Sequence, residues 1–311
     1  MSEELNTEIS ESNQGTSTID SQIAIDKLAE IRNKIDSFSN PNKVIPISEN
    51  KPIYQELQRV DLSFIVLVCD DDKQYLRGCL SSIPAGAEII LLTVLPHSIT
   101  ENGIKNIEEQ VYPNGTMIKS ATYFYYEPDK ELKKWDNFSF AEIRNEALKL
   151  CTRRFVCSLD TDERLSIEPD EIETLNSMPN DIGGIIVSIN NFVYGKDNEK
   201  SKRESLPVLR IFVRDKRVNF VYRCHEQVAQ TIINAGYKVI EWTPIIKHIG
   251  YLHALRIEEV MKNKFLRNYR LLILEMQSAD SCRNPYLMER LMGTINILKQ
   301  MKVFEDKQVW L

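Results

Sequence analysis

The sequence lacks several features that would assign it to a common protein class at once. No apolar stretch approaches the length of a membrane span, and the longest, 62–69, is the size of one strand. The six cysteines include no C-x-x-C pair and no Cys/His cluster with zinc-ligand spacing, so we expect buried, reduced thiols. A Walker A loop, a G-x-G-x-x-G segment and internal repeats are also missing.

An excess of basic charge is missing too. The chain carries 39 Lys and Arg residues against 45 Asp and Glu residues, a net charge of −6, whereas nucleic-acid binding usually needs a basic face. We therefore expect no nucleic-acid partner. The amino terminus lacks the basic and then apolar pattern of a secretory signal, which together with the cysteine usage predicts a cytoplasmic location.

The 311 residues are long enough to bury a substantial core, and their patterning predicts three regions. Residues 1–55 form an extension whose first part, rich in Ser, Thr, Asn and Glu, is predicted to be disordered. Apolar residues then recur at helical spacing at Ile25, Leu28, Ile31 and Ile35. This short helix either docks on the main domain or serves dimerisation or acceptor docking. Residues 56–255 form the main domain, and 256–311 form a helical region packed on it.

Strand-like and helix-like segments alternate in the first half of the main domain. Strands are expected at 63–69, 88–94, 119–126 and 155–160, and helices at 72–82, 100–111 and 139–151. The last of these helices starts with a capping box formed by Ser139 and Glu142. Apolar strands that alternate with helices predict an α/β fold with a mostly parallel central sheet flanked by helices.

The second half is less regular. We expect strands at 183–189, 209–213, 238–241 and 245–248, and helices at 226–235, 256–276 and 285–302. The polar stretch 190–205 between the first two strands is predicted to be a mobile loop, either an ordinary surface loop or a lid. The last two helices have amphipathic patterns and are predicted to be helical carboxyl-terminal elements.

The most informative segment is 155–163, where an apolar run leads directly into two carboxylates. Asp160 and Asp162 are two residues apart, so in extended backbone their side chains point the same way. Two hard oxygen ligands at the carboxyl end of a strand suit Mg²⁺ or Mn²⁺, and that edge is where open α/β sheets bind ligands. Taken alone, the pattern also fits a strand that enters a solvated acidic turn.

Several short blocks, in a fixed order, resemble those of glycosyltransferase family 2. The blocks are 135–145, similar to a segment ending F-x-x-x-R-N; 158–163, similar to D-x-D-E; 210–212 with 225–226, similar to R-[LI]-F…H-E; and 247–251, similar to H-x-G-Y. Residues of the next helix, Lys264, Arg267, Asn268, Leu271 and Leu272, extend the resemblance. The resemblance implies a GT-A nucleotide-diphospho-sugar transferase fold, with 56–255 as the catalytic domain and an inverting, nucleotide-sugar-dependent activity.

The resemblance also implies metal ligands. Asp162 would contact the metal directly, Asp160 would bind it through water or hold the ribose, and His248 would be the third protein ligand. A histidine suits Mn²⁺ better than Mg²⁺, although His248 is also compatible with a satisfied histidine at a strand end. Such a metal acts as a Lewis acid on the leaving diphosphate.

Glu226 is the candidate general base, because inversion needs a carboxylate opposite the leaving nucleotide to take the acceptor's proton. The segment that follows it resembles the family's E-D-x-x…G-Y-K pattern, with Glu226 at the position of the base. A glutamate at a helix start is also an ordinary partner of the helix dipole. His225 is expected to orient the acceptor or to touch the phosphate.

Further residues are candidates for donor binding. Arg144 would meet a phosphate or the carboxylate of Asp160, or would form an ion pair that holds helix to strand; Asn145 lies beside it. Asp136 would contact the nucleotide or cap its loop. The strand 88–96 lacks the carboxylate with which many family members bind uracil, so Asp70 or Asp71 is a candidate for that contact, or belongs to a solvated acidic turn that caps the next helix.

The sequence therefore predicts a metal-dependent hexosyltransferase that uses a nucleotide-sugar donor, with UDP as the default by family frequency. The acceptor would be a hydroxyl or thiol of a glycan, a glycolipid or a protein, and the amino-terminal helix makes a homodimer worth testing. The alternative is a GT-A-like binding or scaffold module without turnover, which the missing uracil carboxylate favours. Retention of Asp160, Asp162, Glu226 and His248 together argues against it.

Overall fold

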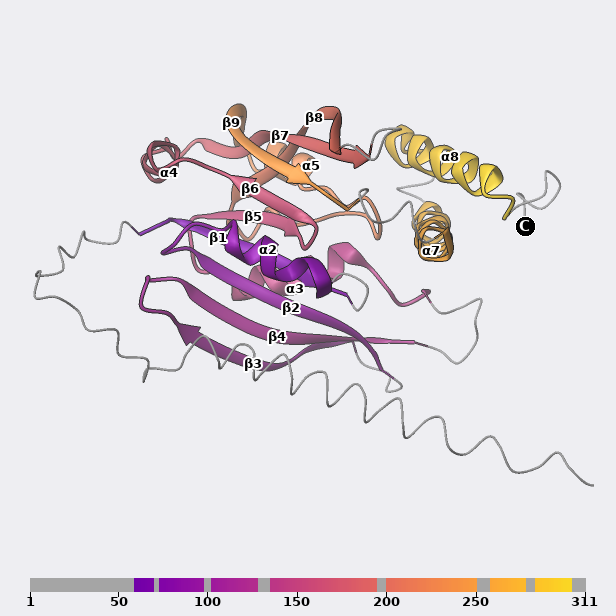
Figure 1. The fold of residues 1–311 in the computed structure, drawn as a ribbon, viewed down its shortest axis with the longest axis horizontal. Coiled ribbons are helices and arrows are strands. Elements are labelled where there is room, and N and C mark those ends of the chain that lie inside the picture. Colours follow the sequence, from indigo (N-terminus) through magenta and orange to yellow (C-terminus); the bar gives the residue numbers. More distant parts are fainter. Residues whose placement is uncertain are drawn as a thin grey trace, which may run out of the picture. The chain divides into compact units, whose positions relative to one another are not determined.

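The computed structural model describes residues 59–69, 73–97, 102–127, 135–194, 200–250, 258–277 and 283–303 (Figure 1). All of them belong to one structural unit, Gln55–Leu311. The predicted extension 1–55, with its helix at 25–35, lies outside the described residues, and so do Asp70 and Asp71. Within the described ranges, no helix is both long and apolar enough to cross a membrane.

The described residues form a nine-stranded sheet in the order β3-β4-β2-β1-β5-β8-β7-β9-β6. The strands are β1 (Leu62–Val68), β2 (Glu88–His97), β3 (Gly103–Val111), β4 (Met117–Tyr126), β5 (Phe155–Asp160), β6 (Glu163–Ser166), β7 (Ile182–Tyr194), β8 (Lys200–Val213) and β9 (Lys238–His248). The block β4-β2-β1-β5 is parallel throughout, as is the pair β7 and β9. The other four pairings are antiparallel, so the predicted α/β sheet is confirmed as a mixed one.

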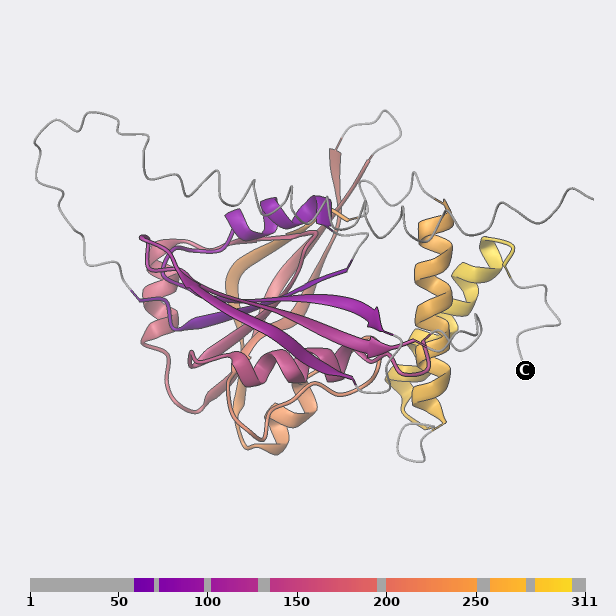
Figure 2. The same ribbon diagram turned by 90° about the horizontal axis from the view of Figure 1, so that it is seen from below.

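Helices cover both faces of this sheet and stand beyond one end of it. They are α2 (Lys73–Ser81), α3 (Phe140–Leu150), α4 (Pro169–Asn176), α5 (Ala229–Asn234), α7 (Glu258–Met276) and α8 (Pro285–Gln300). Figure 2 shows α2 on one face and α3 and α5 on the other. It also shows α7 and α8 beyond the end toward which the arrowheads of β2 and β4 point. The helical carboxyl-terminal elements are thus placed at the carboxyl ends of the parallel strands.

The parallel block carries the centre of the core. Every residue of β1 is buried, and so are the first five residues of β5. Strands buried on both faces need a nearly continuous apolar run, which is the pattern that predicted them from the sequence. The core therefore holds the end of β5, and with it Asp160, in a fixed place.

Helix α3 buries an arginine along with its apolar face. Ser139 caps the helix by accepting a hydrogen bond from the Glu142 amide, which is one half of the predicted capping box, while the Glu142 side chain accepts from Tyr123. The buried side of α3 consists of Ala141, Ile143, Arg144 and Ala147. Because a guanidinium without partners is very unfavourable in a core, burial of Arg144 requires acceptors close by.

The helix predicted at 100–111 is wrong, since this segment is the edge strand β3, paired antiparallel with β4. Ile104, Ile107 and Val111 recur at helical spacing, a pattern that favours a helix. Ile107 and Val111 are 56% and 63% exposed, so they do not form a buried helical stripe. A register shift between Lys105 and Glu108 in β3 further breaks the alternation expected of a strand.

Three boundaries in the second half also differ from the prediction. The predicted loop 190–205 contributes instead to a long pairing of β7 with β8, with Asn190 opposite Ser205 and Tyr194 opposite Lys200. The residues of this segment are mostly polar, so they lack the apolar pattern from which strands are predicted. The two strands predicted between 238 and 248 are one strand, β9, and the helix predicted from 226 begins only at Ala229.

Candidate active site

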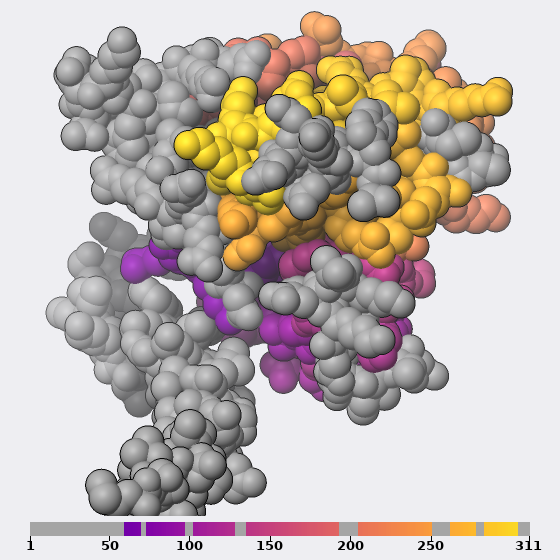
Figure 3. Space-filling view, turned by 90° about the vertical axis from the view of Figure 1, so that its right-hand side faces the viewer, coloured from indigo at the N-terminus to yellow at the C-terminus, as the bar shows by residue number. Residues whose placement is uncertain are grey.

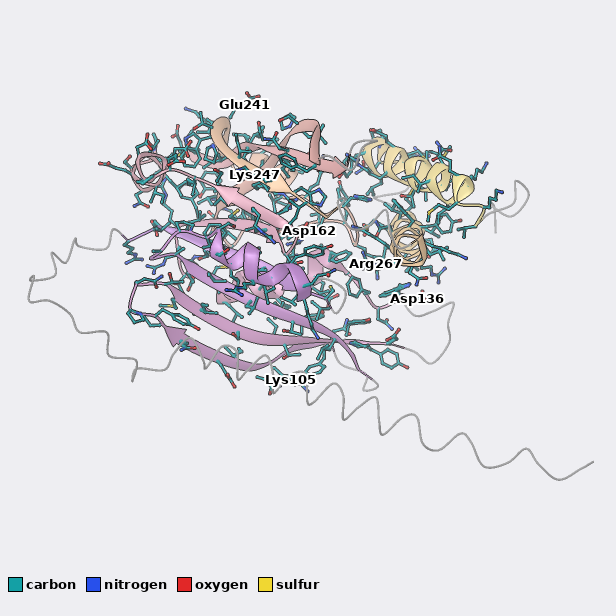
Figure 4. The ribbon with its side chains drawn as sticks, viewed as in Figure 1. Lys105, Asp136, Asp162, Glu241, Lys247 and Arg267 are labelled. Atoms are coloured by element: carbon teal, nitrogen blue, oxygen red, sulfur yellow. The ribbon has the colours of Figure 1, made fainter. Side chains whose placement is uncertain are left out.

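A tight turn joins β5 to β6 and holds the two aspartates of the D-x-D segment. Asp160 ends β5, and Glu163 begins β6. Strand β6 pairs with β9 so that Glu163 lies opposite His248, and the amide of Ile249 donates to the Asp162 carbonyl at 3.0 Å. In Figure 4, Asp162 lies toward α7, whereas Glu241 marks the far part of β9. The antiparallel pairing thus brings the D-x-D and H-x-G-Y segments together.

Asp162 and His248 face each other across this turn. The distance from His248 Nε2 to Asp162 Oδ2 is 3.2 Å, and each side chain is 16% exposed. His248 Nδ1 lies 2.8 Å from Asn191 Oδ1, and because an amide oxygen only accepts, Nδ1 carries the hydrogen. The lone pair of a neutral Nε2 would then point at a carboxylate, an arrangement that a proton or a cation between the two atoms satisfies.

The electrostatics of His248 agree with this geometry. Burial disfavours the charged imidazole, but the hydrogen bond and the charge of Asp162, together with Glu163 and Asp160, raise the pKa of His248 above its ordinary value. The pair therefore attracts positive charge.

Gly250 allows this close approach. A Cβ atom at this position would lie 2.0 Å from Asp162 Oδ2 and 3.0 Å from His248 Nε2. The first contact is far too short for a carbon atom and involves an oxygen that faces the imidazole, and the second is tighter than most Cβ contacts. The glycine of the H-x-G-Y segment is thus explained by lack of space rather than by backbone conformation.

Arg144 joins two candidate residues that are far apart in the sequence. Its Nη2 donates to Asp160 Oδ1 at 2.7 Å and its Nε donates to Glu226 Oε1 at 2.5 Å. A third bond runs from Nη1 to Ser158 Oγ. An ion pair between helix and strand was one of the roles predicted for Arg144, and the structure contains it. Arg144 forms a second ion pair with Glu226.

A second, largely covered arginine supports the same turn. Arg210 Nη2 donates to Glu163 Oε1 at 2.6 Å and lies 3.8 Å from Asp160 Oδ2. Glu163 Oε2 accepts from the Asp160 amide at 2.9 Å. Sequence reasoning gave Arg210 and Glu163 no role, although both lie in the blocks that carry the family resemblance.

The pKa values of Asp160 and Glu163 shift in opposite directions. Burial opposes ionisation of Asp160, but Arg144 and Arg210 outweigh it and hold its pKa well below the ordinary range. Burial, assisted by Asp160 and Asp162, raises the pKa of Glu163 to about 7. Asp160 is therefore the permanently ionised member of the pair.

Glu226 lies in an irregular segment with unusual backbone. Tyr222 and His225 have φ of 74° and 56°, two of the four non-glycine residues with positive φ in the described ranges. Such strain persists only where the surroundings impose it, and here a bridge between Val221 and Gln227 closes the segment. The side chain of Glu226 is 13% exposed, so one carboxylate is held at a partly open edge.

The side chains of Asp136 and Asn145 each form hydrogen bonds with a distant segment of the chain. Asp136 forms two hydrogen bonds with Arg270 of α7, at 2.8 and 2.9 Å. Both ends of the Asn145 amide bond the main chain of Phe220, at 2.8 and 2.9 Å. Among the described residues, neither side chain contacts the Asp160–Asp162 turn, and their roles in donor binding stay predictions.

The predicted metal ligands converge only in part. In the described part of the chain, no group of three or more His, Cys, Asp or Glu side chains is arranged to hold a metal ion. Asp162 and His248 come together, whereas Asp160 faces Arg144. Two protein ligands nevertheless suffice for a cation of the Mg²⁺ or Mn²⁺ type, because substrate phosphates commonly supply the rest.

A scan of family models and a search of the curated proteins gave no match. Among solved structures, the chain is similar to S. aureus TarS 1–349, with 11% identity over 79% of this chain and 75% of that one and a TM-score of 0.38. A longer S. aureus TarS structure is 14% identical in an alignment that covers 75% of this chain and 43% of the TarS chain, with a TM-score of 0.37. TarS 1–349 in complex with UDP-GlcNAc has 10% identity, coverages of 77% and 72% and a TM-score of 0.37.

Proposed function

We propose that the chain is a metal-dependent, inverting glycosyltransferase that moves a hexosyl group from a nucleotide-sugar donor, UDP-linked by family frequency, to a hydroxyl or thiol of a glycan, glycolipid or protein. The observation that carries the proposal is a convergence at one sheet edge. Asp162 contacts His248, and Arg144 joins Asp160 to Glu226. These are the four residues that the sequence motifs single out.

On the donor side, Asp162 and His248 would hold Mn²⁺ or Mg²⁺, with the donor's diphosphate completing the ligands. When bound, the cation supplies Lewis-acid stabilisation of the leaving diphosphate. Asn191 fixes the tautomer that leaves His248 Nε2 available. Asp160, kept ionised by its two arginines, would hold the ribose or reach the cation through water.

On the acceptor side, Glu226 would take the proton of the attacking hydroxyl or thiol. Arg144 binds Oε1 of this carboxylate, and within the described residues Oε2 makes no hydrogen bond. A carboxylate anchored through one oxygen can accept a proton on the other without turning away. Arg144 therefore acts as a positioning residue for both sides of the reaction.

The proposal is tested by thermal unfolding of the purified chain with UDP, GDP and CMP, each with and without Mn²⁺. We expect one nucleotide to raise the unfolding temperature only when the metal is present, because a bound ligand stabilises the folded state. The same nucleotide should then be released from its sugar donors during turnover. Stabilisation by none of the pairs would contradict the proposal.

The degenerate binding module is the second candidate, because both Asp160 and Glu226 are already engaged by Arg144. It predicts metal-dependent nucleotide binding without donor turnover. Transfer or donor hydrolysis by the wild-type chain that disappears in Glu226→Gln would exclude it.

A further inference from the structure

Three cations on α7 and α8 have no acidic partner among the described residues. Lys264 and Arg267 lie on α7 and Arg290 lies on α8, and none of them forms a salt bridge with a described residue. We call them the basic cluster. Arg267 Nε is buried without a hydrogen-bond partner in the described part of the chain. In Figure 3, which faces this side, α7 and α8 occupy much of the surface.

Contacts with aromatic rings fix the positions of the two arginines of the basic cluster. The Arg267 guanidinium lies 4.9 Å from the centre of the Phe140 ring and 5.8 Å from that of Trp135. Arg290 lies 5.1 Å from the centre of the Tyr286 ring, and the Tyr286 hydroxyl donates to the His225 carbonyl at 3.2 Å. Both arginines are thus fixed by aromatic rings beside the segment that carries Glu226.

The electrostatics agree with this placement. Burial and then the charges of Arg290, Lys264 and Arg267 lower the pKa of His225, against an opposing effect of Glu226. The largest charge effects on the pKa of Asp160 come instead from Arg144, Arg210 and His248. The basic cluster therefore acts on the acceptor side of the candidate active site.

The carboxylates around this segment are already engaged. Glu226 is paired with Arg144, Asp136 is paired with Arg270, and Glu275 accepts from the Arg223 amide. None of them neutralises the basic cluster. Cations that lack an acidic partner among the described residues, around a partly buried guanidinium, are the composition of an anion-binding site, since arginine binds phosphate and carboxylate oxygens through parallel hydrogen bonds.

We propose that Lys264, Arg267 and Arg290 bind an anionic group, a phosphate or a carboxylate, of the sugar acceptor while Glu226 takes a proton from its nucleophile. This inference rests on the proposed glycosyl transfer and narrows the acceptor to an anionic molecule. A neutral glycan could accept a hydrogen bond from Arg267 Nε through a hydroxyl oxygen, but it would bring no negative charge to the three cations.

The test is binding of inorganic phosphate to the full chain, measured by titration calorimetry with and without saturating Mn²⁺ and UDP. We expect Arg290→Gln and Lys264→Gln each to weaken phosphate binding by about tenfold, the loss of one charge-assisted contact. Both side chains are exposed, so the variants should fold. Lys262→Gln is the matched control, because Lys262 is exposed on the same helix and should leave phosphate binding unchanged.

Arg267→Lys is the further variant, because it keeps the charge but removes the planar group that stacks on Phe140. It should also weaken phosphate binding. Wild-type chain that binds nucleotide with Mn²⁺ but binds no phosphate, or binds it equally in all variants, would overturn this inference and leave the proposed function standing. Phosphate that competes with UDP would assign the cluster to the donor and would also overturn it.

A chain that binds no nucleotide at all would remove the proposed function and with it the acceptor assignment. The supporting result is phosphate binding that adds to nucleotide binding and depends on the cluster. It is sharpened by comparing phosphorylated with unphosphorylated sugars as acceptors, where only the former should give product.

Discussion

Two buried charged clusters lie at opposite ends of the parallel strands, and they are built differently. At the amino end of β2, Glu88 accepts from Lys119, Ser63 and Thr152 and is fully buried. At the carboxyl end of β5, Asp160 is 44% exposed at its side chain, although its partner Arg144 is buried. The carboxylate of the first cluster is fully buried among its partners, whereas the second cluster has a carboxylate that is accessible to solvent.

The contrast separates a cluster whose carboxylate is fully satisfied by the chain from one that leaves room for a ligand. Every neighbour that Glu88 needs comes from the chain itself, so nothing is left for a ligand. The carboxyl-end cluster instead combines partly open carboxylates with a strained segment at 222–225. We expect damage at the amino end to lower stability, and damage at the carboxyl end to lower activity in a chain that still folds.

The largest effect should follow from Glu226→Gln. The amide cannot accept the acceptor's proton, so transfer should fall by about 100-fold or more, while metal-dependent nucleotide binding is kept. Steady-state transfer rates and thermal shifts measure the two properties. Glu241→Gln, an exposed change on β9, is the control. Unchanged transfer in Glu226→Gln would break the assignment of the base.

Next in size is the loss of stability in Glu88→Ala. Removal of this carboxylate leaves Lys119, which is 11% exposed at its side chain, without its buried partner, and the unfolding free energy should drop by about 3 kcal/mol. Urea unfolding measures it, with Glu241→Ala as the control. Nucleotide binding by the folded fraction should be unchanged, and its loss would erase the contrast between the two clusters.

A smaller effect is expected for Asn191→Ala. Without the amide oxygen that fixes the His248 tautomer, the Mn²⁺ concentration that half-saturates nucleotide stabilisation should rise by about tenfold. Asn234→Ala, an exposed change on α5, should have no effect. Equal metal dependence in both variants would mean that His248 does not serve the metal.

The smallest effect is the pH dependence of the amino-end cluster. Burial opposes ionisation of Glu88, but hydrogen bonds from Lys119, Ser63 and Thr152 lower its pKa below the ordinary 4.5. The stabilisation is therefore present above pH 4.5 and lost as the pH falls through the lower value in the folded state. Urea titrations at several acidic pH values should show the difference between wild type and Glu88→Ala narrowing, and a constant difference would contradict the assignment.

The sequence predicted the parallel block, and the same pattern led to Asp160 and Asp162 as candidate site residues. Buried strands produce continuous apolar runs, and Asp160 and Asp162 follow one of them directly. The supporting layer could not be found in this way. Arg210 and Glu163 are 47 residues apart, and His248 and Asn191 are 57 apart, and only the antiparallel pairings of β5–β8, β7–β8 and β6–β9, with the parallel pair β7–β9, bring them together.

Arg144 binds both Asp160 and Glu226, so a movement of one carboxylate affects the other. A ligand that drew Asp160 toward itself would move the guanidinium of Arg144, and with it the carboxylate of Glu226. Under the proposed roles of these residues, donor binding and acceptor binding would then be thermodynamically linked, and each ligand would change the affinity of the other by the same factor. Arg144→Lys, which cannot bridge both carboxylates, should make the two binding events independent.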